Sequence, residues 1–166
     1  MQKITPFLWF EDNAEEAAKY YVSVFPNSKI KEVIKYPEAA EEASGQPSGS
    51  VMTVTLTLNG MDFQFLNGGM VEGYNLSTSG SVSFVIHCKS QKEIDKYWKA
   101  LSAVPEVEQC GWCRDKFGVT WQIVPDVLGN YLTDPDKQRV ERVTACFMKM
   151  KKFDIKELEN AYKGGE

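Results

Sequence analysis

Residues 115–125 of the 166-residue chain read D-K-F-G-V-T-W-Q-I-V-P, and the rest of the predicted fold follows from comparison with this segment. A polar pair and a glycine that tolerates positive φ precede alternating bulky residues, which predicts a tight hairpin turn leading into a buried strand. Residues 59–67, N-G-M-D-F-Q-F-L-N, repeat the design 58 positions earlier. The repeat matches Gly60 with Gly118, Phe63 with Trp121, and Gln64 with Gln122.

A second repeat lies upstream of each of these strands. Apolar residues 4–11 and 81–88 predict two strands, and each is followed by a cap residue with glutamate three positions later. The two capping boxes are Asn13 with Glu16 and Ser90 with Glu93. A shift of 77 superposes these units and places Phe7 on Phe84. The sequence therefore predicts an internally duplicated module.

The predicted fold is α+β, with two tandem βαβββ modules forming curved mixed sheets. The first module covers residues 1–70, a linker covers 71–80, and a compressed second module covers 81–126. Residues 37–49 predict an exposed loop in the first module. A helical extension covers 127–166, with helices starting at Asp134-Pro135 and at Asp154. We expect these helices to cover the sheet or to contact a partner subunit.

Composition excludes several classes of partner. The formal net charge is −4, so no general basic field exists to attract nucleic acid. No apolar run reaches the length of about eighteen residues that spans a bilayer. We expect a soluble, cytoplasmic protein that binds neither nucleic acid nor membrane.

The four cysteines include a C-x-x-C pair, Cys110 and Cys113. A redox role requires a thiolate stabilised at a helix N-terminus, whereas residues 106–115 are predicted to be extended. On a strand the two sulfurs would point to opposite faces. We therefore interpret them as buried or half-buried thiols.

Five motifs carry a family resemblance: I-T-P-F-L-W-F at 4–10, N-A-E-E-A at 13–17, L-N-G-G at 66–69, E-Q-C-G-W at 108–112, and the stretch at 115–125. With the duplicated module, they resemble the vicinal-oxygen-chelate superfamily of glyoxalase I, extradiol dioxygenases and bleomycin-resistance proteins. The resemblance is greatest to its PhnB-like branch, often labelled 3-demethylubiquinone-9 3-methyltransferase, and covers nearly the whole chain. It implies sheets that enclose a cleft for a small molecule, usually in a homodimer.

In metal-dependent members of that superfamily, His and Glu ligands lie on the first and last strands of each module. The resemblance places Pro6, Ser83, Gln64 and Gln122 at or beside these positions. Neutral amides lack the charge of carboxylates, and neither proline nor serine replaces imidazole. We therefore expect no metal and no other cofactor.

An apolar cleft with a few polar anchors suits a small, partly aromatic ligand. The predicted ligand-binding residues are Trp9, Gln64, Phe65, Asn67, Ser83, Trp112, Trp121 and Gln122. The aromatic members are equally suited to packing in a core. Because side chains alternate along a strand, either the glutamines or their aromatic neighbours face the cleft, and not both.

His87, the only histidine, is a weak candidate for a catalytic base or a structural residue. The favoured function is metal-independent binding of a small molecule. One alternative is a superfamily enzyme of the lyase or dioxygenase type, with an atypical metal site or with His87 as base. Another is the methyltransferase of the family label, although the sequence shows no glycine-rich loop of the kind that a nucleotide-like cofactor generally requires.

Overall fold

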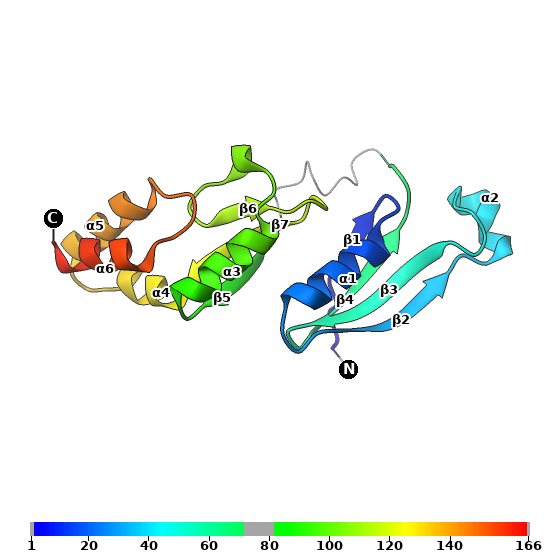
Figure 1. Cartoon of the computed structure of the whole chain (residues 1–166), viewed down its shortest axis with the longest axis horizontal. Coiled ribbons are helices and arrows are strands. Elements are labelled where there is room, and N and C mark those ends of the chain that lie inside the picture. The colour runs from blue at the N-terminus through cyan, green and yellow to red at the C-terminus, as the bar shows by residue number, and fades with distance from the viewer. Residues whose placement is uncertain (1, 72–81, 166) are drawn as a thin grey trace. The chain divides into compact units, whose positions relative to one another are not determined.

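The computed structural model describes residues 2–71 and 82–165, which fall into two compact units, Met1–Ser79 and Gly80–Glu166 (Figure 1). Most of the predicted linker, from residue 72 on, lies outside the described residues. Each unit holds one sheet with one long helix packed on one of its faces, α1 in the first and α3 in the second. The predicted α+β class is confirmed.

The first unit has the predicted order of strands and helix: β1 (Phe7–Phe10), α1 (Ala14–Val24), β2 (Lys29–Lys35), β3 (Val51–Leu58) and β4 (Met61–Asn67). The strands lie in the order β1-β4-β3-β2. β1 runs parallel to β4, and the remaining pairs are antiparallel. This arrangement confirms the βαβββ module.

The β3–β4 hairpin forms because Asn59 and Gly60 adopt φ of 46° and 86°, the left-handed values that a tight two-residue turn needs. Along β3, alternate residues Val54, Leu56 and Leu58 are buried, and the intervening threonines are half-buried. Contacts of α1 with β3 and β4 identify the buried side as the face that the helix covers. The predicted period of two therefore separates a core face from an open face.

The N-terminus of α1 is capped by the sheet. Within the described residues, Asn13 makes no capping bond with its own side chain. Instead, Asn67 Oδ1, at the end of β4, accepts a 2.7 Å hydrogen bond from the Ala14 amide. Asn67 Nδ2 donates to the Val51 carbonyl at 3.1 Å, so this buried amide joins helix and sheet. The predicted Asn13 capping box is wrong for this reason.

The second unit contains β5 (Phe84–Cys88), α3 (Gln91–Leu101), a 3-10 turn η2 (Pro105–Val107), β6 (Trp112–Arg114) and β7 (Thr120–Pro125). Its sheet has the order β5-β7-β6, with β5 parallel and β6 antiparallel to β7. Within residues 82–165 no strand corresponds to β2, so the compression removes one strand. The predicted Ser90 cap of α3 is confirmed, because Ser90 Oγ accepts from the Glu93 amide. Glu93 Oε2 accepts from the Lys89 amide, one residue before the cap, where a strict capping box would use the Ser90 amide.

The two modules superpose with different shifts for different elements. The helices match at the predicted shift of 77, since α1 spans Ala14–Val24 and α3 spans Gln91–Leu101. In the strand ladders, however, Phe7 pairs with Gln64 and Val85 pairs with Gln122, so the first strands match at a shift of 78. Pairing Phe7 with Phe84 is therefore wrong by one residue. The chain between strand and helix has three residues in the first module and two in the second.

Two segments differ from their predicted structure. The exposed loop at 37–49 contains a 3-10 turn, η1 (Glu38–Ala40), and one helical turn, α2 (Glu41–Ser44), that ends at Gly45 with φ of 67°. The segment 106–115 is not uniformly extended, because Cys110 and Gly111 form a turn with φ of 50° and 82°. Strand alternation therefore does not apply to the two cysteines of the C-x-x-C pair.

The C-terminal extension forms α4 (Asp126–Leu132), α5 (Lys137–Phe147) and α6 (Ile155–Lys163). α4 was not predicted, whereas Asp154 caps α6 as expected and Gly164 ends it with φ of 76°. α5 packs mainly on α4 and α6, and the Tyr162 hydroxyl donates a hydrogen bond to Asp134. None of the helices in the described part of the chain combines the length and apolar character needed to cross a bilayer.

Candidate functional site

Each sheet has a core face under its helix and an open face on the other side. In the first unit Phe63 and Phe65 of β4 are buried under α1, and the ring centroid of Tyr21, on the helix, lies 5.9 Å from that of Phe65. In the second unit Trp121 is 4% exposed on the core face, and its ring centroid lies 5.5 Å from that of Phe84. The glutamines therefore lie on the open faces, which decides between the two orientations that the sequence allowed.

A row of three paired residues crosses the open face of the second sheet. Gln122 on the central strand pairs with Val85 on one side and with Trp112 on the other. Val85 is 46% exposed and Trp112 is 37% exposed, so both apolar side chains are accessible beside the amide. Gln122 Nε2 donates a 2.9 Å hydrogen bond to Ser83 Oγ. The row places a neutral polar group between two apolar ones.

The first sheet has a related row. Gln64 pairs with Phe7, which is 52% exposed, and with Thr55 on its other side. Trp9, two residues after Phe7, is half-buried, and its Nε1 donates to the Gly69 carbonyl at 2.9 Å. The Trp9 ring also explains why residue 68 is a glycine, because a Cβ on Gly68 would lie 2.1 Å from the ring. Trp9 is thus fixed at the margin of this open face by its contacts with the L-N-G-G segment.

The predicted ligand-binding residues consequently separate into two groups. On the open faces or their margins lie Trp9, Gln64, Ser83, Trp112 and Gln122. In the core lie Phe65, Asn67 and Trp121, which are 0%, 6% and 4% exposed. Burial leaves these three side chains little surface for a ligand, and the bonds of Asn67 and Trp121 show structural roles instead.

Trp121 and the turn before it are organised by one buried carboxylate. Asp115 is 2% exposed, and its Oδ2 accepts a 2.7 Å hydrogen bond from Trp121 Nε1. Its Oδ1 accepts from the amides of Phe117 and Val119 at 2.9 and 3.1 Å. Gly118 turns with φ of 89°. The interpretation of Asp115 as a turn residue is confirmed, and its bond to the indole adds a role in the core.

His87 lies on the open face of the second sheet, where its side chain is 72% exposed. Its Nδ1 is 3.5 Å from Oδ1 of Asp126, the first residue of α4. Sequence reasoning missed both Asp126 and Val85. A signal was present for Asp126, because it directly follows a strand that runs parallel to the strand of His87, and such strands end at the same edge of a sheet.

The cysteines are free thiols. Burial raises the pKa of Cys88 to about 12 and, acting together with Asp115, raises the pKa of Cys113 to about 12. Cys110 is half-exposed in its turn. Across residues 2–71 and 82–165, no three His, Cys, Asp or Glu side chains are close enough together to hold a metal ion.

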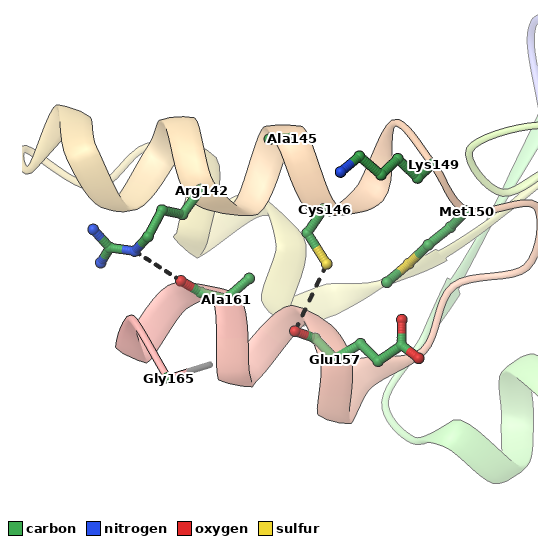
Figure 2. A pocket seen from close by; sticks show the side chains of 8 residues that line it. All are labelled: Arg142, Ala145, Cys146, Lys149, Met150, Glu157, Ala161 and Gly165. Carbon is green, nitrogen blue, oxygen red and sulfur yellow. Dashed lines mark hydrogen bonds between the residues drawn. The ribbon is translucent and has the colours of Figure 1, made fainter.

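A hollow of about 490 Å³ lies between α5 and α6 (Figure 2). Arg142 borders it and donates from Nε to the Ala161 carbonyl at 3.0 Å, near the C-terminus of α6. A cation at this end of a helix stabilises the last carbonyls. Cys146 also lines the hollow, with its Sγ 3.8 Å from the Glu157 carbonyl. Helix-to-helix bonds therefore occupy two of the polar side chains of this hollow.

Comparison with known proteins places this architecture in a family. The profile of the 3-demethylubiquinone-9 3-methyltransferase family matches residues 2–124. The match ends before α4 and therefore does not include the C-terminal helices. No curated protein matches the chain.

Two solved structures have similar folds. The PhnB protein from Bacillus cereus is 31% identical, with a TM-score of 0.60, over 75% of this chain and 99% of that one. A protein from Pseudomonas aeruginosa is 18% identical, with a TM-score of 0.51, over 75% of this chain and 98% of that one, and supports the fold alone. From the family match, the duplicated module and the Bacillus cereus relative, we conclude that the chain belongs to the 3-demethylubiquinone-9 3-methyltransferase family, in its PhnB-like branch.

Proposed function

We propose that the chain is a metal-independent small-molecule-binding protein that holds its ligand on the open face of the second sheet. The observation that carries the proposal is the row Val85–Gln122–Trp112. Because the Gln122 NH₂ group donates to Ser83, the amide oxygen is the group oriented to accept a hydrogen bond from a ligand. An indole and a valine on either side favour a flat, uncharged, partly aromatic molecule.

The side chains of this open face also favour a neutral ligand over a metal complex. Gln64 and Gln122 are the side chains at the centre of the two open faces, and amides are weak ligands for divalent metals compared with carboxylates. The test is metal analysis of protein purified without a histidine tag. Stoichiometric zinc, nickel or iron that is lost on Gln122→Ala would contradict metal-independent binding.

Ligand binding is tested by thermal shift with a panel of neutral aromatic metabolites. A compound that binds the folded state raises the melting temperature by mass action. We expect at least one such shift in the wild type, and its loss in Gln122→Ala and Trp112→Ala. Lys99→Ala, on the exposed side of α3, is the matched control and should keep the shift. A shift that survives both open-face substitutions would refute the proposed site.

One observation favours an enzymatic alternative, in which His87 acts as a base positioned by Asp126. The carboxylate 3.5 Å from Nδ1 would fix the imidazole orientation while Nε2 faces a substrate. In that case a compound from the panel should be converted, and His87→Gln should stop its conversion while leaving its thermal shift intact. The family label adds S-adenosylmethionine to the panel, and a shift with this compound would favour a methyltransferase.

The proposal includes a homodimer in the cytoplasm. Exposed Phe7, Val85 and Trp112 supply apolar surface that a partner subunit or ligand would cover, and four free thiols suit a reducing compartment. Light scattering at micromolar concentration should give twice the chain mass of 18.8 kDa. The monomer mass would remove the dimer from the proposal.

A further inference from the structure

Sulfur atoms are concentrated at the C-terminal end of α5. Cys146, Met148 and Met150 follow one another at alternate positions there, and the Cys110 turn packs against them. Cys110 Sγ lies 4.0 Å from Met148 Sδ and 3.5 Å from the Phe147 carbonyl oxygen. Two soft donor atoms from distant parts of the chain therefore meet at one point, and neither residue belongs to the row on the open face. The family profile covers Cys110 but ends before Met148.

Backbone hydrogen bonds hold the two segments together. The Cys110 amide donates to the Met150 carbonyl at 2.8 Å, and the Gly111 amide donates to the Lys151 carbonyl at 2.7 Å. A Cβ on Gly111 would lie 2.4 Å from the Phe153 ring, so the turn and the chain after α5 are in close contact. The fold thus holds the two backbone segments together, and the Met148 side chain brings its sulfur to within 4.0 Å of Cys110 Sγ.

We propose that Cys110 and Met148 form a binding site for a soft monovalent cation, Cu(I). Thiolate and thioether sulfur are the ligands that favour Cu(I) over harder cations. With metal–sulfur bonds of about 2.3 Å, a separation of 4.0 Å gives a sulfur–metal–sulfur angle of roughly 120°, which suits trigonal coordination. The third position faces solvent, because Met148 is 53% exposed, and it is open to a small external thiol.

Binding replaces a proton by the metal. The Cys110 thiol releases its proton to solvent, and the sulfur donates an electron pair to Cu(I), which stays in the same oxidation state. Met148 donates a lone pair of its thioether without losing a proton. The Phe147 carbonyl is a hard oxygen that now accepts from the thiol, and it is released when the proton leaves.

The other cysteines are poorer competitors. Cys88 and Cys113 are 0% exposed, and burial raises the pKa of each thiol to about 12. Burial also raises the pKa of Cys146, whose thiol faces the Glu157 carbonyl. Cys110 combines access to solvent with a second sulfur at a fixed distance.

The test is anaerobic titration of the full-length, untagged protein with Cu(I), in competition with the chromogenic chelator bicinchoninate. We expect one Cu(I) per chain, with a thiolate-to-copper absorption band in the ultraviolet. Cys110→Asn should abolish this binding. Among residues 2–71 and 82–165, asparagine occupies the other two non-glycine positions of positive φ, Asn27 and Asn59, so this variant suits the turn and should stay folded.

Met148→Leu is the decisive variant, because it removes only the thioether and should weaken binding by roughly tenfold or more. Cys146→Ser is the matched control and should leave affinity and stoichiometry unchanged. If Met148→Leu binds as tightly as wild type, the metal is held by ordinary thiol reactivity and the proposal is wrong. Absence of one-to-one binding, or its loss in Cys146→Ser, would also overturn it, and neither outcome affects the ligand proposed for the open face.

Discussion

Replacing Asp115 should strongly destabilise the second unit. The carboxylate accepts from the Val119 amide at 3.1 Å and from Trp121 Nε1 at 2.7 Å, and both donor residues are less than 5% exposed. Leaving a buried donor without a partner costs about 1–3 kcal/mol. Asp115→Ala leaves two such donors, so we expect the free energy of unfolding to fall by about 3–4 kcal/mol.

Asp115→Asn keeps the shape of the side chain but removes its charge and replaces one acceptor oxygen by an NH₂ donor. The amide keeps one oxygen for the turn amides but presents its NH₂ group to the indole N–H, so two donors face each other. The expected loss is about 1–3 kcal/mol. In the double variant with Trp121→Phe this conflict disappears, so the two substitutions should be coupled by about 1 kcal/mol or more.

Urea unfolding followed by far-ultraviolet circular dichroism measures all of these variants, including those that lack the indole. Lys116→Ala, at an exposed position in the same turn, is the control and should change stability by less than about 0.5 kcal/mol. A loss below about 1 kcal/mol in Asp115→Ala would show that water replaces the carboxylate, and the argument from buried donors would fail.

Three further predictions test other contacts. In urea unfolding, Gly68→Ala should cost about 1–3 kcal/mol because its Cβ meets an indole ring, whereas Gly129→Ala should stabilise by about 0.5–1 kcal/mol, because Gly129 lies inside α4 and an added Cβ would meet no described atom within 4 Å beyond the adjacent helix backbone; equal effects would contradict the close contact. Ser90→Ala should cost about 1 kcal/mol and Asn13→Ala less than half of that, since only the serine side chain caps its helix; a larger loss for Asn13→Ala would contradict this. The hydrogen bond from the Tyr162 hydroxyl holds the pKa of Asp134 below its ordinary value. The ionised carboxylate therefore stabilises the fold fully at a pH above the ordinary pKa, and this stabilisation is lost as the pH falls through the lowered pKa. Near-ultraviolet circular dichroism should show this acid transition, and Asp134→Asn should remove it.

Local signals predicted most of the fold correctly. The Asn59-Gly60 turn, the alternation along β3 and the Ser90 cap depend on residues a few positions apart, and their chemistry nearly determines their structure. The cap of α1 was predicted wrongly because its acceptor, Asn67, is 53 positions away from Ala14. A sequence pattern cannot show which distant side chain reaches a helix end when a local candidate is present.

The candidate site was only half predictable for a similar reason. Alternation showed that Gln64 and Phe65 face opposite sides of β4, but the choice of side depends on where α1 packs. For the C-x-x-C pair, the assumption of a strand failed because Cys110-Gly111 turns the chain with positive φ. The glycine after Cys110 was the available signal, since it favours a turn over a continuous strand.

The shift between the two modules shows why register, and not motif similarity, locates the open face. Matching the helix caps at a shift of 77 residues superposes Phe84 on Phe7, but the strand pairing makes Val85 the counterpart of Phe7. A displacement of one residue exchanges the two faces of a strand. Accordingly Phe84 packs against Trp121 in the core, whereas Val85 flanks Gln122 on the open face. The counterpart of Pro6 is therefore Phe84 and not Ser83, and Ser83 contributes to the site through its hydrogen bond to Gln122.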